Sequence, residues 1–176
     1  MANKRALFYC SANFNIDPKY NVAAENIVAA ASDKGYEIVS GGGDKGTMAV
    51  VCRTAFEHGA RVRGILPKFM EGLEYPGMDE LIWTDTMSER KQIMREDVEV
   101  AVALPGGIGT LDEISETLCL AKMGIYKGKT IFFNLDGFYD DYIALLKKFV
   151  REKMYPQEAL DAIFFPSTVE ELVELL

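Results

Sequence analysis

The chain has 176 residues, 49% of them hydrophobic, and its 19 lysines and arginines against 27 aspartates and glutamates give a net charge of −8. This size and composition predict one globular domain spanning residues 1–176. The acidic charge argues against nucleic acid or an anionic membrane as a general partner, because both would be repelled.

Hydropathy and cysteine usage narrow the class of protein further. No apolar run approaches the ~18 residues of a membrane span, and the first residues lack the apolar core of a signal peptide. The widely spaced Cys10, Cys52 and Cys119 are predicted to be buried free thiols in a reducing, cytoplasmic environment. With His58 as the only histidine, we expect neither a metal site nor a histidine-based triad.

Apolar, strand-like runs alternate with helical patterns along the whole chain. The strands are expected at residues 5–10, 37–40, 61–66, 81–84, 98–104, 130–135 and 162–165. A polar turn, residues 11–15, follows the first strand, and Asp17 and Pro18 are typical of a helix start. The alternation predicts a three-layer α/β sandwich with a mainly parallel sheet.

A first glycine-rich turn lies between the second strand and the next helix. Residues 41–48 read GGGDKGTM. Such a stretch can be a simple flexible connection, or its backbone can approach a ligand closely. Because a second turn of this kind follows the strand at 98–104, both are expected at the same edge of the sheet, where ligands bind in open α/β folds.

Residues 67–80 form a long connection with no clear period, containing Pro67, Gly72, Pro76 and Gly77. Loops of this length are often lids or binding loops. Beyond it, Thr86 and Glu89 have the spacing of a capping box. Arg90 and Lys91 then stand in the first turns of that helix, where the dipole disfavours cations. The pair indicates either a bound anion or a solvated face.

The second glycine-rich turn carries the strongest functional signal. Residues 104–113 read LPGGIGTLDE, between a strand apolar at nearly every position and a helix. The free amides and positive dipole of a helix start favour phosphate. Glu113 lies one turn inside that helix, beside the expected phosphate.

The same stretch has a purely structural interpretation. Thr110 and Glu113 also match a capping box, in which Glu113 would reach back to a backbone amide. A further capping box is expected at Ser167 and Glu170, opening the last helix.

Three motifs in this order resemble the Lonely Guy (LOG) family, long labelled putative lysine decarboxylases. The family pattern P-G-G-x-G-T-x-x-E stands at residues 105–113, M-x-x-R-K-x-x-M at 87–94, and G-G-G-x-x-G-x-M at 41–48. The resemblance spans nearly the whole chain.

The resemblance implies a Rossmann-like sheet in a homodimer or larger even assembly, with no cofactor. It implies hydrolysis of the N-glycosidic bond of a nucleoside 5′-monophosphate, such as a cytokinin riboside monophosphate or AMP, to free base and ribose 5-phosphate. Arg90 and Glu113 are carried over as catalytic. The substrate-binding set is Gly42, Gly43, Gly46, Thr47, Met48, Arg90, Lys91, Gly106, Gly107, Ile108, Gly109, Thr110 and Glu113.

This chemistry suits the residue types. Glycosidic cleavage builds positive charge on the sugar, and we hypothesise that Glu113 stabilises that charge and activates water. Arg90 would pair with Glu113 or contact the substrate. The main rival is a non-catalytic nucleotide or molybdenum-cofactor carrier on the same scaffold. A pyridoxal-phosphate decarboxylase lacks a recognisable lysine site, and a dinucleotide oxidoreductase lacks G-x-G-x-x-G after the first strand.

Several positions depart from the family pattern. Ser11 and Ala12 stand for Gly-Ser, Ser40 for tyrosine, Asp112 for glutamate, and Cys119 and Leu120 for Thr-Trp. They lie near the expected pocket or dimer seam and therefore bear on which base is preferred.

Overall fold

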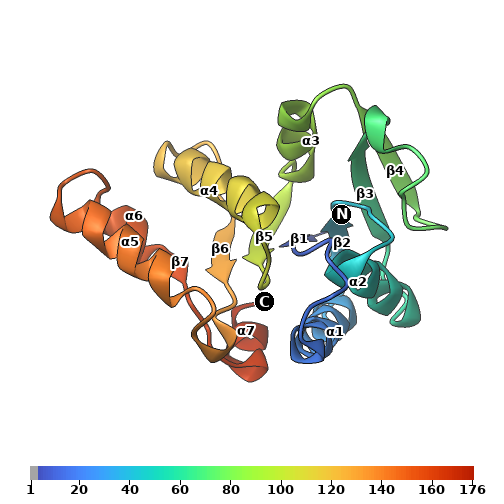
Figure 1. Ribbon diagram of the computed structural model, residues 1–176, viewed down its shortest axis with the longest axis horizontal. Helices are drawn as coiled ribbons and strands as arrows, with labels where there is room; N and C mark the ends of the chain where they lie inside the picture. Colours follow the sequence, from blue (N-terminus) through green and yellow to red (C-terminus); the bar gives the residue numbers. More distant parts are fainter. Residues whose placement is uncertain (1–3) are drawn as a thin grey trace.

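The computed structural model describes residues 4–176, and its strands form one parallel sheet (Figure 1). The strands are β1 (Arg5–Tyr9), β2 (Glu37–Ser40), β3 (Val62–Pro67), β4 (Glu80–Thr84), β5 (Val98–Ala103), β6 (Lys129–Phe132) and β7 (Ile163–Phe164). The helices are α1 (Pro18–Asp33), α2 (Gly46–Glu57), α3 (Met87–Met94), α4 (Ile108–Lys122), α5 (Asp140–Arg151), α6 (Gln157–Asp161) and α7 (Val169–Leu175), with 3-10 turns η1 (Lys68–Met70) and η2 (Leu135–Gly137). The predicted three-layer α/β fold is confirmed.

Strand β1 lies at the centre of the sheet, whose order is β4-β3-β2-β1-β5-β6-β7. The chain builds one half outward from β1 to β4 and then crosses through α3 to β5 on the other side. The order of strands therefore reverses between β1 and β5. Ligands of open α/β sheets bind outside the carboxyl ends of the strands at such a point.

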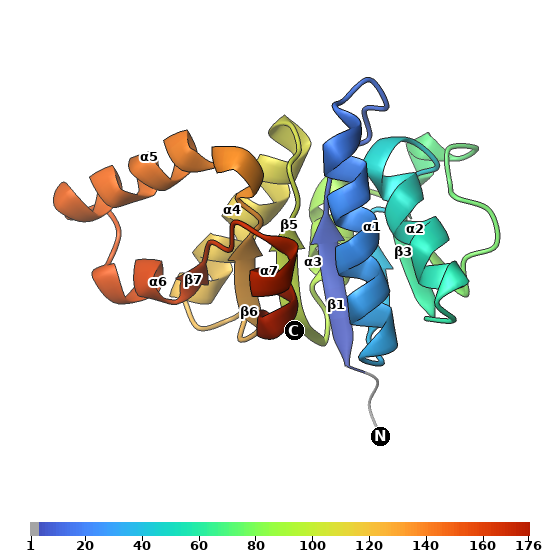
Figure 2. The same cartoon turned by 90° about the horizontal axis from the view of Figure 1, so that it is seen from below.

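The two faces of β1 belong to two separate cores, because successive side chains of a strand point to opposite faces. Ala6 and Phe8 pack with α1, α2 and α7, whereas Leu7 and Tyr9 pack with α3, α4, α5 and α6. Figure 1 shows α3 and α4 above the sheet, and Figure 2 shows α1, α2 and α7 over the opposite face.

Three local predictions need correction. The last helix is capped by Thr168 and Glu171, one residue later than the predicted Ser167 and Glu170, because Thr168 accepts from the Glu171 amide and the Glu171 carboxylate accepts from the Thr168 amide. The last strand spans only two residues, and α6 was not predicted.

Among the described residues, no helix has the length and apolarity needed to cross a bilayer.

Candidate active site

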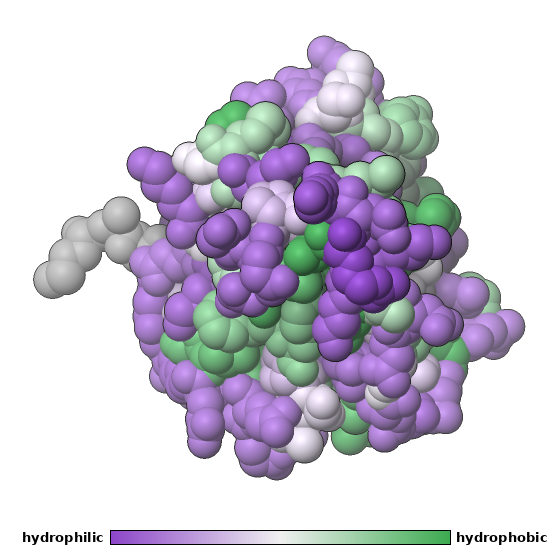
Figure 3. All heavy atoms as spheres, turned by 90° about the vertical axis from the view of Figure 1, so that its left-hand side faces the viewer, coloured by the Kyte–Doolittle hydropathy of each residue, from purple (hydrophilic) through white to green (hydrophobic). Residues whose placement is uncertain are grey.

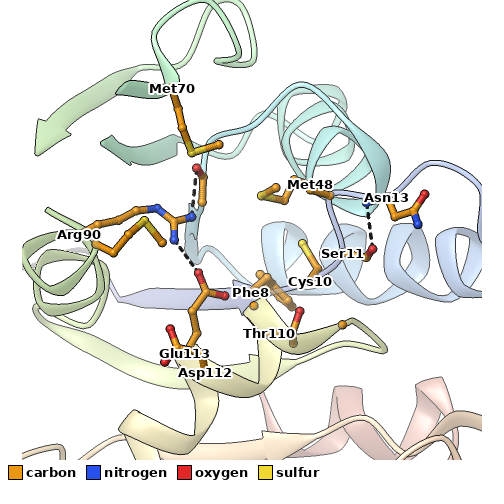
Figure 4. A pocket seen from close by; sticks show the side chains of 15 residues that line it. Phe8, Cys10, Ser11, Asn13, Met48, Met70, Arg90, Thr110, Asp112 and Glu113 are labelled. Carbon is orange, nitrogen blue, oxygen red and sulfur yellow. Dashed lines mark hydrogen bonds and ion pairs between the residues drawn. The ribbon is translucent and has the colours of Figure 1, made fainter. Parts of the chain in front are cut away.

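A cavity of about 390 Å³ opens at the carboxyl ends of the central strands (Figure 4). It lies at the point of strand-order reversal and takes residues from the turn after β1, the glycine turn before α2, η1, α3 and the start of α4. Its lining is Phe8, Cys10, Ser11, Ala12, Asn13, Gly41, Met48, Met70, Met87, Arg90, Gly107, Gly109, Thr110, Asp112 and Glu113.

Arg90 and Glu113 form a buried ion pair in this cavity. Arg90 Nη1 donates to Glu113 Oε1 at 2.7 Å, and the two side chains are 7% and 10% exposed. Arg90 Nε also donates to the Ile65 carbonyl at 2.9 Å and Nη2 to the Gly41 carbonyl at 3.4 Å. All three sides of the guanidinium are therefore occupied, which fixes Arg90 and through it the carboxylate.

Gly41 makes room for that arrangement. A Cβ at this position would lie 2.3 Å from Arg90 Nη2 and 2.9 Å from Met48 Sδ. Arg90 can reach the Gly41 carbonyl only because no side chain stands there.

Burial raises the pKa of Glu113 above the ordinary value of a glutamate, and the adjacent Arg90 charge partly offsets this shift. A second carboxylate, Asp112, is 56% exposed and forms an ion pair with Lys91. The two neighbouring carboxylates thus have different environments, which is typical of groups with different roles.

The start of α4 lacks a side-chain cap. Gly107 is the N-cap and forms no side-chain hydrogen bond. Thr110 lies inside the helix, 2% exposed, and its buried Oγ1 has no hydrogen-bond partner. The capping-box interpretation of Thr110 and Glu113 is therefore wrong, because Glu113 binds Arg90 instead. A Cβ on Gly106 would lie 2.2 Å from Thr110 Oγ1, so the glycine provides the space for that hydroxyl.

Four residues of the first glycine turn predicted to bind substrate lie outside the lining. The Gly42 carbonyl accepts from the Tyr75 amide, and Gly43 forms a bridge with Glu74. These contacts hold the loop that carries η1.

The other two residues of that turn contact the segment after β1 and helix α1. Gly46 has φ +59°, and a Cβ there would lie 2.6 Å from the Asn13 carbonyl. The backbone of the turn after β1 can therefore approach α2 only at a glycine. Thr47 Oγ1 donates to Asn21 Oδ1 at 2.9 Å. Met48 does line the cavity.

Three further predicted binding residues also lie outside the lining, namely Gly106, Lys91 and Ile108. Lys91 forms ion pairs with Asp112 and Glu116 at 2.9 and 2.7 Å, and Ile108 is 84% exposed. The predicted box at Thr86 and Glu89 is half formed, because Thr86 accepts from the Glu89 amide whereas the Glu89 carboxylate accepts from the Asp85 amide.

The sequence did not single out nine lining residues as site residues, namely Phe8, Cys10, Ser11, Ala12, Asn13, Gly41, Met70, Met87 and Asp112. Several signals pointed to them, since Ser11, Ala12 and Asp112 were noted as departures near the expected pocket, Gly41 and Met87 stand in the family motifs, and the long loop 67–80 was recognised. Ligands of open α/β sheets bind at the carboxyl ends of the strands, which is where the residues after β1 lie.

The cysteines differ from expectation in one case. Cys10 and Cys52 are buried and free as predicted, but Cys119 is exposed. Within residues 4–176, no cluster of three histidine, cysteine or acidic side chains could hold a metal ion.

Comparisons with known proteins agree with the motifs. The family described as "Possible lysine decarboxylase" matches residues 48–176. The "Cytokinin riboside 5'-monophosphate phosphoribohydrolase LOG" of Oryza sativa subsp. japonica is 32% identical over 97% of this chain and 71% of its own length. The Arabidopsis thaliana phosphoribohydrolase LOG2 is 29% identical over 98% of this chain and 82% of its own.

Solved structures share the fold. The molybdenum cofactor binding protein of Rippkaea orientalis superposes with a TM-score of 0.76 at 21% identity, covering 99% of this chain and 96% of that one. The molybdenum cofactor carrier protein of Chlamydomonas reinhardtii gives 0.75 at 19% identity, with 98% and 96% covered.

Proposed function

The chain belongs to the family described as "Possible lysine decarboxylase", to which the LOG phosphoribohydrolases belong, and we propose that it hydrolyses the N-glycosidic bond of a nucleoside 5′-monophosphate. Cytokinin riboside monophosphates and AMP are the proposed substrates. The observation that carries the proposal is the buried Arg90–Glu113 pair beside an uncapped helix start.

The 5′-phosphate would bind at the start of α4. Gly107 and Gly109 line the cavity, and an added Cβ at either would meet open space. Free amides and a helix dipole there favour an anion. The buried Thr110 hydroxyl, which lacks a partner, would donate to a phosphate oxygen. Local groups would thus bind the phosphate, because the net negative charge of the chain does not attract an anion.

The reaction breaks the C1′–N bond, whose electron pair leaves with the base, while water adds to C1′ and gives up a proton. The departing base takes up one proton, so that the overall proton count balances. Positive charge accumulates on the sugar before the new bond forms. Glu113 would stabilise that charge and accept the proton from water. Arg90 would keep the carboxylate ionised and oriented in spite of its burial.

A carrier function is the alternative, and the fold shared with molybdenum cofactor carriers is compatible with it. Below 25% identity, that likeness concerns the fold alone. A buried acid paired with an arginine that two backbone carbonyls also hold favours the enzyme, because binding a phosphorylated ligand does not need a carboxylate beside its sugar.

The test is to incubate the purified protein with AMP, with a cytokinin riboside 5′-monophosphate and with the matching nucleosides, and to measure free base and ribose 5-phosphate. We expect turnover of the nucleotides and little of the nucleosides, which lack the phosphate. Binding of nucleotides without release of base would favour the carrier.

Replacing Thr110 with valine should weaken phosphate binding while keeping the shape of the side chain. Loss of one hydrogen bond to a charged group costs about 1.5–3 kcal/mol, so KM for AMP and the inhibition constant of ribose 5-phosphate should rise roughly 10- to 100-fold together. Thr110→Ser, which keeps the hydroxyl, is the matched control. Equal constants for valine and wild type would contradict the assignment.

The raised pKa of Glu113 predicts where activity falls in acid. Glu113 must be ionised to act, so kcat/KM should decrease as the pH drops through this raised pKa. The acid limb should therefore lie above the ~4.3 of an ordinary glutamate. A pH profile of AMP hydrolysis measures it, and an acid limb at or below that value would contradict the prediction.

The resemblance also supports a homodimer, working in the cytoplasm with each chain as one domain. Four large apolar side chains within α5 or just after α4 and α5 are exposed, namely Met123, Ile125, Leu145 and Met154. Figure 3 views the end of the molecule that carries α5 and α6, where apolar residues gather within a hydrophilic surface. We propose that a second copy covers this end.

Light scattering at micromolar concentration should give twice the chain mass of 19.6 kDa. The double variant Met123→Glu, Ile125→Glu should give the monomer mass. A wild-type monomer would refute the dimer, and a dimeric variant would place the interface elsewhere.

A further inference from the structure

The walls of the cavity divide into a polar and a thioether side. Arg90, Glu113 and Thr110 form the polar side with the start of α4. Met48 from α2, Met70 from η1 and Met87 from α3 line the same cavity. In Figure 4, the side chains of Met48 and Met70 point into the space above Phe8 and Glu113.

Met48, on the thioether side, lies next to the Arg90–Glu113 ion pair. The Sδ of Met48 and the Nη2 of Arg90 both lie against Gly41, at 2.9 and 2.3 Å from the Cβ that any other residue would carry. A sugar placed at Glu113 with its phosphate on α4 would therefore direct the group on C1′, the base, toward the methionines.

The position of Met70 depends on the first glycine turn. The Asp44 amide donates to the Leu73 carbonyl at 2.9 Å and the Tyr75 amide to the Gly42 carbonyl at 2.8 Å. These bonds fasten the loop after η1 to the cavity rim, which places Met70 over the cavity.

Backbone carbonyls beside the methionines are already engaged. The Gly41 carbonyl accepts from Arg90, the Gly42 carbonyl from the Tyr75 amide, and the Met70 carbonyl from the Leu73 amide. A thioether donates no hydrogen bond and accepts only weakly. Apart from Thr110, the uncharged polar side chains of the lining are Ser11 and Asn13, which lie on the other side of Met48 from Met70 in Figure 4. The methionine side of the cavity thus offers few hydrogen-bond donors or acceptors to the polar edge of a base.

Building on the proposed function, we infer that Met48, Met70 and Met87 form the nucleobase subsite and select the base by size and apolar contact, not by its hydrogen-bonding edge. Methionine is flexible and polarisable, which lets one wall adapt to several flat rings. The subsite then accepts bases by their fit to this wall, including bases with an apolar substituent on the ring.

Comparing AMP with IMP tests this inference, because the two bases have nearly the same shape and opposite donor and acceptor patterns at the six-position edge. An apolar pocket discriminates near-isosteres by about 10- to 200-fold, whereas a hydrogen-bonding site reaches about 10⁴ to 10⁵. We expect kcat/KM for the two nucleotides to agree within about 10-fold. A preference above about 1,000-fold would overturn the inference.

Matched variants of Met70 test whether this side chain contacts the base. Met70→Gln has a similar length but adds a donor and an acceptor, so the AMP to IMP ratio should change by about 10-fold or more. Met70→Leu should keep the wild-type ratio, since it stays apolar at similar volume. Inhibition by ribose 5-phosphate, which lacks a base, should stay the same in both. An unchanged ratio in the glutamine variant would remove Met70 from the subsite.

Failure of this inference can be told apart from failure of the proposed function. Calorimetric titration of the wild type with AMP and IMP measures the base subsite without turnover. Equal affinities without hydrolysis would refute the proposed enzymatic function and support the methionine subsite. Hydrolysis of AMP with no binding of IMP would support the enzymatic function and refute the methionine subsite.

Discussion

Replacing Glu113 with glutamine should lower kcat for AMP by roughly 1,000-fold or more while AMP still binds, because a neutral amide neither stabilises a cationic sugar nor accepts a proton from water. The amide oxygen can still accept from Arg90, whose other contacts to Ile65 and Gly41 remain. Ribose 5-phosphate release measures the turnover, and calorimetry measures the binding.

Glu116→Gln is the matched control for this variant. Glu116 lies one turn further along α4, is paired with Lys91 and Arg95, and does not line the cavity. The same change of charge there should alter kcat by no more than a few-fold. Comparable losses in both variants would mean that the effect comes from net charge or from folding, and full activity of Glu113→Gln would refute the proposed role.

Replacing Arg90 with alanine should cost both activity and stability. Removing one partner of a buried ion pair costs about 3–5 kcal/mol, because the other charge stays buried and unpaired. The carbonyls of Ile65 and Gly41 would also lose their donor. For a chain of this size, the melting temperature should fall by roughly 6–20 °C, which thermal unfolding followed by circular dichroism measures.

An exposed ion pair with the same separation is the control that shows how much of the Arg90 effect comes from burial. Lys68 and Asp85 also lie 2.7 Å apart, but their side chains are 65% and 73% exposed. Lys68→Ala should therefore leave the melting temperature almost unchanged.

A double change then separates stability from chemistry. Arg90→Met combined with Glu113→Leu removes both charges, so it should recover the part of the stability lost to the unpaired carboxylate but not turnover. Recovery of turnover in that variant would contradict the role of the pair.

Local pattern was enough to predict the sheet, because each strand contains a short apolar run and stands beside a turn or helix signal. It failed where stability comes from distant contacts. Helix α6 has only five residues, and β7 has two residues held by pairing with β6. The box at Thr110 and Glu113 satisfied the local rule and was still wrong, because Arg90 lies 23 positions away in the chain and takes the carboxylate.

The candidate site shows the same division. The motifs singled out Arg90, Glu113 and Thr110, which the structure brings together. They could not separate the glycines that face the cavity, such as Gly107, from those that hold other backbone, such as Gly46. Nor could they place Met70, whose position depends on hydrogen bonds between the glycine turn and a loop 30 residues later.

The central place of β1 has a consequence for synthesis on the ribosome. Tyr9 pairs with Ala103, so β1 is translated about 94 residues before its second neighbour β5 is available. At about 5–20 residues per second this is a delay of roughly 5 to 20 seconds. During that time the nascent chain exposes the unpaired edge of an apolar strand, a template for aggregation. Chaperone demand should therefore peak before β5 leaves the exit tunnel.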